Sequence, residues 1–433
     1  MKKAAFYTLG CKVNQYETEA MSELFGKAGY EIVDFESAAD VYVINTCTVT
    51  GMSDRKSRQI IRRAKKINPD AIIAVTGCYA QTSPDAVRMI DGVNVIIGTK
   101  DRGKIVSMVE NAKKSSKTDA VSDIMQTHTF EDLSVKTYRD RTRAYIKIQE
   151  GCNQFCSYCI IPYARGPIRS RPFSDVLNEI KLLSASGFSE IVLTGIHVAS
   201  YGLDLEKYDL ADLILAADKF EGIKRIRLSS IEPMTLDKSF IRRIKNAKTL
   251  CPHFHISLQS GCDETLFRMN RKYTTEDYAK IADGIRESFE DAAITTDIMV
   301  GFPGETDEEF SKTVDFVKKI GFADAHIFQY SPRKGTPAAA RSDQISPEVK
   351  FKRSKIISEI TEKSKIEFQK SFIGKTKEVL FEKRAENGLF EGKTDNYLTV
   401  AVPCEEDLSG RFFSVLLKET APFGILGEIQ LPN

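Results

Sequence analysis

Three thiols lie within eight residues of the sequence, at Cys152, Cys156 and Cys159, and these cysteines are called the central trio below. The neighbouring Asn153 and Ser157 are polar, so the segment does not resemble an apolar core segment. A zinc ribbon would show two CxxC pairs, and the sequence has no second pair. A cubane iron–sulfur cluster usually takes four thiolates, so three leave one iron with an open coordination position. Because an open position distinguishes a catalytic metal site from a structural one, we predict a catalytic [4Fe-4S] cluster here.

A second set of three cysteines, the N-terminal trio, follows three apolar segments in the first part of the chain. The segments are residues 4–10, 41–46 and 71–77, followed by Cys11, Cys47 and Cys78. Each segment is a short β-rich run that leads into a helical pattern, which indicates parallel strands with crossover helices. Ligands of open α/β sheets bind at the carboxyl ends of the strands, so we predict that the three thiols converge on a second cluster. The alternative is three separate buried or incidental cysteines.

Two further regions follow this parallel α/β region. Six βα units have candidate strands at residues 144–149, 190–194, 225–229, 254–258, 294–300 and 325–330. They predict a partial (βα)6 barrel, open on one side, with the central trio at its active-site end. Short strands with turns then predict a small antiparallel β-barrel. We therefore expect an α/β protein with domains at residues 1–123, 138–370 and 371–433, and a polar linker at 111–123.

The composition is that of a globular protein without a membrane anchor. Of 433 residues, 42% are hydrophobic and 28% are charged, and no apolar run approaches the roughly 20 residues that a membrane helix needs. The stretch before Cys11 is shorter than the apolar region of about 7–15 residues in an export signal. Nine cysteines without a small-domain disulfide framework favour a reducing compartment. We therefore expect a cytoplasmic protein with no membrane partner.

Several motifs together resemble those of the methylthiotransferases, a family of radical S-adenosylmethionine enzymes. The N-terminal motifs are Thr8-Leu-Gly-Cys-Lys-Val-Asn-Gln-Tyr-Glu17, Asn45-Thr-Cys-Thr-Val-Thr50 and Gly77-Cys-Tyr-Ala-Gln81. The central motif runs from Glu150 to Gly166 and contains the CxxxCxxC spacing of radical S-adenosylmethionine enzymes. Residues from Ile373 onward resemble the TRAM RNA-binding domain. The resemblance covers essentially the whole chain, and its motifs look most like those of the branch that acts on threonylcarbamoyladenosine in tRNA.

The resemblance implies a transferase that inserts sulfur and methyl at C2 of a modified adenosine next to the anticodon. No side-chain base can remove the C2 proton, because general bases work when their pKa lies near the operating pH, so a radical route is needed. The resemblance assigns S-adenosylmethionine cleavage to a [4Fe-4S] cluster at the central trio. It assigns delivery of the sulfur to a second [4Fe-4S] cluster at the N-terminal trio. A second S-adenosylmethionine would supply the methyl group.

Further candidates for cofactor contact lie in the central cysteine loop and at the ends of the predicted barrel strands. Tyr158 matches the aromatic residue that the family holds near the adenine of the cofactor, and its alternative role is packing. The strand-end candidates, which have turn formation as their alternative, are Thr194, Gly195, Ser229, Gln259, Gly301 and Phe302. His197, His253 and His255 are interpreted as structural or polar pocket residues, because the two trios already provide metal ligands.

Basic residues border both cysteine sets, although the formal net charge is only +2. Residues 55–66 carry seven Lys or Arg side chains and no acid, and a solvated helix face is the alternative interpretation. Lys and Arg position RNA through its phosphates, so we predict RNA contacts here and after the central trio. The six candidates are Arg55, Arg58, Arg62, Arg165, Arg169 and Arg171. The C-terminal barrel would add affinity for the RNA backbone.

The expected partners are a tRNA that carries threonylcarbamoyladenosine, a flavodoxin- or ferredoxin-like electron donor, and a sulfur source. Two alternatives stay open. The same chemistry would serve isopentenyladenosine tRNA or an aspartate of a ribosomal protein. A cluster-bearing RNA-binding or redox-sensing protein without turnover is the alternative from another class, and it would release no 5′-deoxyadenosine from S-adenosylmethionine.

Overall fold

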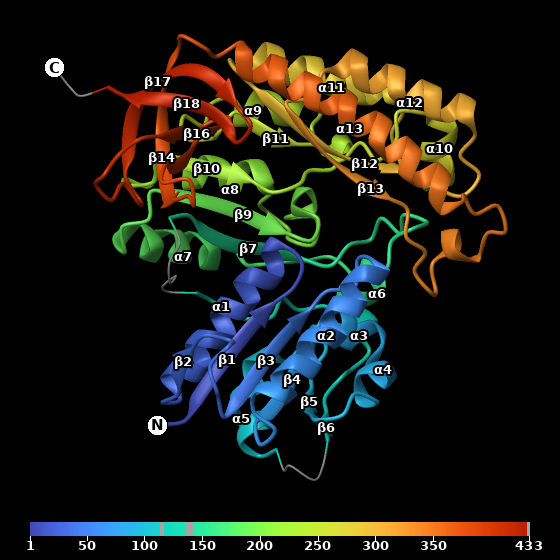
Figure 1. The fold of residues 1–433 in the computed structure, drawn as a ribbon, viewed down its shortest axis with the longest axis vertical. Coiled ribbons are helices and arrows are strands. Elements are labelled where there is room, and N and C mark those ends of the chain that lie inside the picture. The colour runs from blue at the N-terminus through green and yellow to red at the C-terminus, as the bar shows by residue number, and fades with distance from the viewer. Residues whose placement is uncertain (113–116, 136–141, 431–433) are drawn as a thin grey trace.

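The computed structural model describes residues 1–112, 117–135 and 142–430 (Figure 1). The N-terminal region is a parallel sheet in the order β2-β1-β3-β4-β5-β6. Its strands are β1 (Lys3–Thr8), β2 (Glu31–Val33), β3 (Val41–Thr46), β4 (Ile72–Gly77), β5 (Val93–Ile96) and β6 (Thr118–Asp119). Its helices are α1 (Lys12–Lys27), α2 (Gly51–Ile67), α3 (Cys78–Thr82), α4 (Pro84–Arg88) and α5 (Ile105–Glu110), with short 3₁₀ turns η1 (Arg102–Lys104) and η2 (Ile124–Gln126) nearby.

Alternate residues of this sheet pack on opposite faces. Tyr42 and Ile44 belong to one buried cluster, whereas Val41 and Val43 belong to another. Successive side chains of a strand point to opposite faces, so burial on both faces produces the continuous apolar runs seen in the sequence. The predicted parallel sheet is therefore confirmed.

The central region is a partial barrel built from two sheets, in the orders β10-β9-β7-β8 and β11-β12-β13. Its strands are β7 (Ala144–Glu150), β8 (Arg169–Ser170), β9 (Glu190–Gly195), β10 (Arg225–Leu228), β11 (His253–His255), β12 (Ala293–Val300) and β13 (Asp324–Gln329). Its longer helices are α7 (Phe173–Ala185), α8 (Leu210–Ala217), α9 (Lys238–Ile244), α11 (Thr275–Ser288), α12 (Asp307–Ile320) and α13 (Pro347–Lys370). Its shorter ones are α6 (Ile161–Arg165), α10 (Asp263–Arg268), η3 (Val198–Ser200), η4 (Pro233–Thr235) and η5 (Pro337–Ala340).

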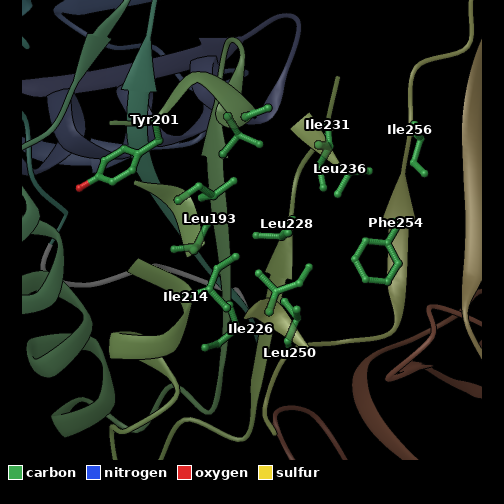
Figure 2. Packing of buried hydrophobic residues seen from close by; sticks show 14 of the residues in the cluster. Leu193, Tyr201, Ile214, Ile226, Leu228, Ile231, Leu236, Leu250, Phe254 and Ile256 are labelled. Carbon is green, nitrogen blue, oxygen red and sulfur yellow. The ribbon is translucent and has the colours of Figure 1, made fainter. Parts of the chain in front are cut away.

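The barrel wall is held by one apolar core between strands and helices (Figure 2). Leu193 from β9, Ile226 from β10 and Phe254 from β11 all point into it, together with Ile214 from α8. Isolated bridges such as Ile226 to Leu250 connect the two sheets. The six predicted βα units are confirmed, and the antiparallel strand β8 is an addition that the sequence analysis did not identify.

The C-terminal region is a closed barrel in the order β14-β15-β16-β18-β17. Its strands are β14 (Thr376–Arg384), β15 (Phe390–Thr394), β16 (Thr399–Val402), β17 (Phe412–Ala421) and β18 (Gly424–Ile429). It lies against the edge of the central barrel, away from the N-terminal sheet (Figure 1). Arg225 on β10 donates to the carbonyl oxygen of Lys393 at 2.9 Å, and Arg227 donates to that of Thr394 at 2.6 Å. Backbone-directed arginines thus fix the small barrel to strand β10.

The expected linker at residues 111–123 needs one correction. Thr118 and Asp119 form β6, which extends the N-terminal sheet by pairing with β5, so this part is a strand and not a linker. Residues 113–116 of the expected linker, and residue 138 as the start of the central domain, lie outside the described residues. The domain boundaries therefore stay predictions. In the described ranges, no helix has both the length and the apolar character that a membrane span requires.

Candidate active site

The central trio lies in the loop that follows β7, at the carboxyl end of the parallel strands. The chain leaves β7 at Gly151, which has a φ of +74°. A Cβ at this residue would lie 1.9 Å from the carbonyl oxygen of Pro167, so only glycine fits the turn. Cys152 then donates its backbone N–H to the carbonyl of Gly166 at 3.0 Å. The backbone therefore ties the start of the cysteine loop to the end of α6.

Gly151→Ala is expected to displace this loop and to lower the iron bound at the central trio, because the new methyl group meets backbone that cannot move aside. Gly187→Ala is the matched control, since Gly187 also has a positive φ, of +92°, but open space around it. In both variants, an alanine held at a positive φ lowers the free energy of unfolding by on the order of 1–3 kcal/mol, so this cost is common to the two. Iron per chain after anaerobic reconstitution checks the prediction, and equal iron in the two variants would contradict it.

The thiols of the central trio lie close enough to influence one another. Burial, together with the negative charge of a Cys156 thiolate, raises the pKa of Cys152 to about 11 and that of Cys159 to about 12. A metal reverses this penalty because it binds the deprotonated thiolate. In the part of the chain that the structure describes, neither trio has all three sulfurs within 4.8 Å of one another. A [4Fe-4S] cluster binds its thiolates through different irons, so it does not require a closer arrangement.

Arg271 contacts the central trio from the barrel wall. Its Nη1 donates to Sγ of Cys156 at 3.4 Å, and its Nη2 donates to Glu232 at 2.8 Å. Hydrogen bonds to cluster sulfurs are one of the factors that set the reduction potential. Arg271 is therefore positioned to influence the reduction potential of a cluster bound at the central trio. Its role could not be predicted from the sequence, since a single arginine far from the cysteines carries no motif.

Buried polar atoms without a partner lie just after β9 and β10. Within the described ranges, both ring nitrogens of His197 and Oγ of Ser229 have no hydrogen-bond partner. Burial, assisted by the positive charge of Arg271, lowers the pKa of His197 to about 4, so its ring is neutral. Leaving such atoms unpaired is costly, and native structures rarely do so. These atoms fit a polar cofactor bound beside the central trio, such as S-adenosylmethionine.

The other predicted cofactor residues divide into two groups. Phe302 has no exposed surface, and Tyr158 packs against the small cluster that Phe302 forms with Tyr330. Phe302 therefore belongs to the apolar cluster on which Tyr158 packs. The remaining candidates occupy the same edge of the barrel: Thr194 and Gly195 end β9, Gln259 bridges to β12, and Gly301 follows β12. Cofactor contact by these residues stays a prediction.

The N-terminal trio also comes together at the carboxyl end of its sheet. Gly10, with a φ of +103°, lets the chain pass Cys47, because a Cβ there would lie 2.9 Å from Cβ of Cys47. Burial raises the pKa of Cys78 to about 12, Arg165 opposes this, and charges on Cys47 and Cys11 add to it. Oδ1 of Asn14 contacts Sγ of Cys11 at 3.9 Å and accepts from Arg165, which itself donates to Sγ of Cys78 at 3.2 Å, so these contacts bring the trio to one site. The trio therefore fits a second [4Fe-4S] cluster with an open iron.

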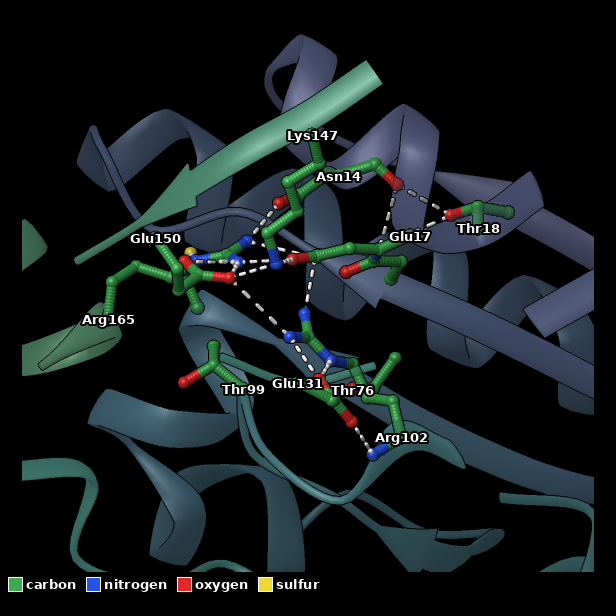
Figure 3. A network of polar contacts seen from close by, with 12 residues as sticks. Asn14, Glu17, Thr18, Thr76, Thr99, Arg102, Glu131, Lys147, Glu150 and Arg165 are labelled. Carbon is green, nitrogen blue, oxygen red and sulfur yellow. Dashed lines mark hydrogen bonds and ion pairs between the residues drawn. The ribbon is translucent and has the colours of Figure 1, made fainter. Parts of the chain in front are cut away.

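A network of buried charges joins the N-terminal trio to the central barrel (Figure 3). Glu17 of α1 accepts from Arg165 at 2.5 Å and pairs with Arg102 at 2.5 Å and Lys147 at 2.7 Å. Nε of Arg165 also donates to Sγ of Cys78 at 3.2 Å. Burial alone would raise the pKa of Glu17, but the three cations outweigh it and hold that pKa well below its ordinary value. Each trio thus has one arginine that donates to one of its sulfurs.

Three of the six arginines predicted to bind RNA are buried: Arg165, Arg169 and Arg171. Arg165 belongs to the network just described. Arg169 donates to the carbonyl oxygen of Pro167 at 2.9 Å, and Arg171 forms an ion pair with Glu179. A guanidinium enclosed by protein cannot reach a phosphate. The prediction of RNA contact is therefore wrong for these three residues, whose charges serve internal carboxylates and carbonyls instead.

The other three arginines predicted to contact RNA, which are Arg55, Arg58 and Arg62, lie on helix α2. Its apolar face, which includes Ile61, is buried, while Arg55 and Arg62 are exposed. Arg58 is half-buried and donates to the hydroxyl of Tyr79 at 3.1 Å. RNA contact through α2 stays a prediction.

Comparisons with known proteins agree with this arrangement. Residues 3–98 match the Uncharacterized protein family UPF0004, residues 146–317 match the Radical SAM superfamily, and residues 370–429 match the TRAM domain. Among solved structures, the radical S-adenosylmethionine methyltransferase TsrM from Kitasatospora setae superimposes with a TM-score of 0.58 at 18% identity, covering 78% of this chain and 77% of that one. At that identity the likeness establishes the fold alone.

Curated relatives match over the full length. The threonylcarbamoyladenosine tRNA methylthiotransferase MtaB of Bacillus subtilis is 45% identical, covering 98% of this chain and 95% of its own. Its namesake from Thermotoga maritima is 37% identical, with 98% and 96% covered. The tRNA-2-methylthio-N(6)-dimethylallyladenosine synthase of Acetivibrio thermocellus is 35% identical, with 98% and 90% covered. The chain therefore belongs to the family of radical S-adenosylmethionine methylthiotransferases and is a transferase enzyme.

Proposed function

We propose that this chain inserts sulfur and a methyl group at C2 of N6-L-threonylcarbamoyladenosine, the modified adenosine next to the anticodon of tRNA. The observation that carries the proposal is the full-length identity of 45% to a relative of that name, against 35% to one named for dimethylallyladenosine. The cofactors are two [4Fe-4S] clusters and S-adenosylmethionine, which serves as radical source and as methyl donor.

The two trios divide the reaction between them. Cys152, Cys156 and Cys159 would hold the first [4Fe-4S] cluster, which when bound would supply the electron for reductive cleavage of S-adenosylmethionine and so make a radical route to the C2–H bond available. Cys11, Cys47 and Cys78 would hold the second [4Fe-4S] cluster, which would deliver the sulfur. Arg271 and Arg165 each donate to one ligand sulfur and so stabilise its thiolate. The neutral ring of His197 and the hydroxyl of Ser229 offer polar contacts to the cofactor.

A cavity of about 680 Å³ where the three regions meet supports the choice of substrate. Lys12, next to Cys11, and Lys393 of the C-terminal barrel both line it. Burial, with help from Arg143 and Arg227, lowers the pKa of Lys12, and burial likewise lowers that of Lys393. An anion in the cavity would stabilise both charged lysines. The threonylcarbamoyl group carries a carboxylate, whereas a dimethylallyl group is neutral and apolar.

The remaining partners belong to the same proposal. Exposed Arg55 and Arg62 of α2 and the closed C-terminal barrel offer surfaces for the tRNA backbone. A flavodoxin- or ferredoxin-like protein would supply electrons, and a separate sulfur source would restore the sulfur that is transferred. A tRNA substrate and thiol-rich metal sites are consistent with the cytoplasm as the compartment.

Nucleoside mass spectrometry tests the proposal. The chain is expressed in cells that lack their own tRNA methylthiotransferases, and their tRNA is digested and analysed. Wild-type protein is expected to produce 2-methylthio-threonylcarbamoyladenosine, and the Cys156→Ala chain, which lacks one ligand of the central trio, is expected to produce none. Appearance of the methylthio derivative of dimethylallyladenosine alone would contradict the proposed substrate. Absence of both products would contradict methylthiotransfer to tRNA.

A further inference from the structure

Strands β11, β12 and β13 present one group of polar side chains on a single face of their sheet. Asp297 lies directly opposite His326 in the parallel register, and His255 lies opposite Thr295. Thr295 and Asp297 are two residues apart on β12, and side chains two apart share a face. Register therefore aligns His255, Asp297 and His326 on three adjacent strands. The intervening apolar residues, such as Ile298, point into the core on the other face.

The three side chains are close enough to share one ion. One ligand atom from each of His255, Asp297 and His326 lies within 4.8 Å of the other two. Nε2 of His255 is 3.3 Å from Oδ2 of Asp297. Nδ1 of His255 is 3.0 Å from the hydroxyl oxygen of Thr295. When Nδ1–H donates to Thr295, the ring is fixed in orientation and Nε2 keeps its lone pair for a metal, as in the outer shells of known metal sites.

We propose that His255, Asp297 and His326 form a site for a divalent transition-metal cation, distinct from both cysteine trios. Two imidazoles and one carboxylate are the ligand set of many catalytic zinc sites and of non-haem iron(II) sites, both of which leave coordination positions open. The chemistry of the ligands therefore favours Zn²⁺ or Fe²⁺ over Mg²⁺ or Ca²⁺, which prefer oxygen ligands alone.

The surroundings leave room for the open positions. All three residues line the 680 Å³ cavity at the junction of the three regions. Asp324 and Glu362 line the same cavity as Lys12, Lys365 and Lys393, and Asp324 pairs with Lys365 at 3.2 Å. Water, or an oxygen atom of a substrate in the cavity, would complete the coordination of the cation. The cation site does not depend on which nucleoside the enzyme modifies.

Cobalt(II) binding to the holoenzyme tests the site. Protein with both clusters reconstituted anaerobically is incubated with Co²⁺, desalted and analysed for cobalt and iron per chain. The high-spin Co²⁺ signal is then recorded by electron paramagnetic resonance with the clusters oxidised. Wild-type protein is expected to bind about one Co²⁺ per chain on top of unchanged iron. Asp297→Asn and His326→Ala are each expected to weaken Co²⁺ binding by at least about 10-fold, while the iron content stays the same.

His128→Ala is the matched control, because His128 is an exposed histidine outside the cavity. It is expected to bind Co²⁺ as the wild-type protein does. Unchanged iron in all chains ensures that the cobalt is not seated at a cysteine trio. The proposal is overturned if the wild-type holoenzyme retains no cobalt after desalting, or if Asp297→Asn and His326→Ala retain as much as His128→Ala.

Discussion

Replacing Cys156 with alanine is expected to abolish cleavage of S-adenosylmethionine to 5′-deoxyadenosine. Cys156 is one of the three proposed cluster ligands of the central trio and accepts the hydrogen bond from Arg271, so its loss would leave the cubane with two thiolates. Two clusters hold about eight irons, and we expect the variant to retain about four. Iron analysis and chromatography of the products formed with a chemical reductant check both outcomes.

The contrasting substitution is Cys78→Ala in the N-terminal trio. It is expected to lower iron by about the same amount and to abolish methylthiolation of tRNA, yet to leave 5′-deoxyadenosine formation in place. Cys404→Ala, at a half-buried cysteine outside both trios, controls for the loss of a thiol and is expected to keep full iron. If Cys78→Ala stopped S-adenosylmethionine cleavage while Cys156→Ala did not, the roles of the two trios would be reversed.

Arg165→Met is expected to destabilise the protein by about 3–5 kcal/mol, the usual result of removing one partner from a buried ion pair. Methionine keeps most of the volume but removes the donors to Glu17, Glu150 and Cys78. Two buried carboxylates would then share Arg102 and Lys147. We expect a lower denaturation midpoint in urea under anaerobic conditions, together with a more negative potential at the N-terminal cluster.

Arg62→Met makes the same chemical change at an exposed position of α2, and it is expected to alter stability by no more than about 0.5 kcal/mol. Combining Arg165→Met with Glu17→Gln is expected to cost less than the sum of the two single changes, because the first change has already broken the pair. Additive effects would argue that Glu17 and Arg165 are not coupled. If Arg165→Met left the urea denaturation midpoint unchanged, the result would show that the buried charge network around Glu17 does not contribute to stability.

Much of the cysteine placement follows from local sequence. Strands β3 and β4 each begin with four apolar residues, and Cys47 and Cys78 are the residues that follow the two strands. A parallel sheet brings such positions to one edge whatever its detailed packing. The central trio is even more local, since its loop is closed by Gly151 and the hydrogen bond to Gly166. Short-range patterns were sufficient to predict these features.

The roles of the arginines did not follow from local sequence. A run of basic residues indicates that negative partners exist, but it does not distinguish an external phosphate from an internal carboxylate. Arg165 pairs with Glu17, 148 positions earlier in the chain, and only the docking of α1 onto β7 brings them together. A retrospective signal was present in β7, where Lys147 and Glu150 are charged residues within a buried strand. Charges in such positions usually have each other as partners.

The same limit applies to the histidines. His255, Asp297 and His326 come from three strands separated by long helical segments, and their alignment depends on the parallel register. A shift of one residue would turn the affected side chain to the opposite face. The spacing of residues in the sequence does not determine the register between β11, β12 and β13, so the grouping of these three side chains could not be predicted.

The buried charge network limits how this enzyme can be divided or recombined. Glu17 and Arg102 belong to the N-terminal region, whereas Lys147, Glu150 and Arg165 belong to the central one. In a chimera that takes its N-terminal region from a distant relative, that region would need charged residues complementary to Lys147, Glu150 and Arg165. Without them, charged side chains would be left unpaired in a buried interface, which is destabilising. The N-terminal and central regions therefore have to be exchanged together. The C-terminal barrel is bound to β10 through backbone carbonyls, which any sequence provides, so an exchanged barrel has to match fewer side chains, chiefly the partners of Arg143 and Asp291.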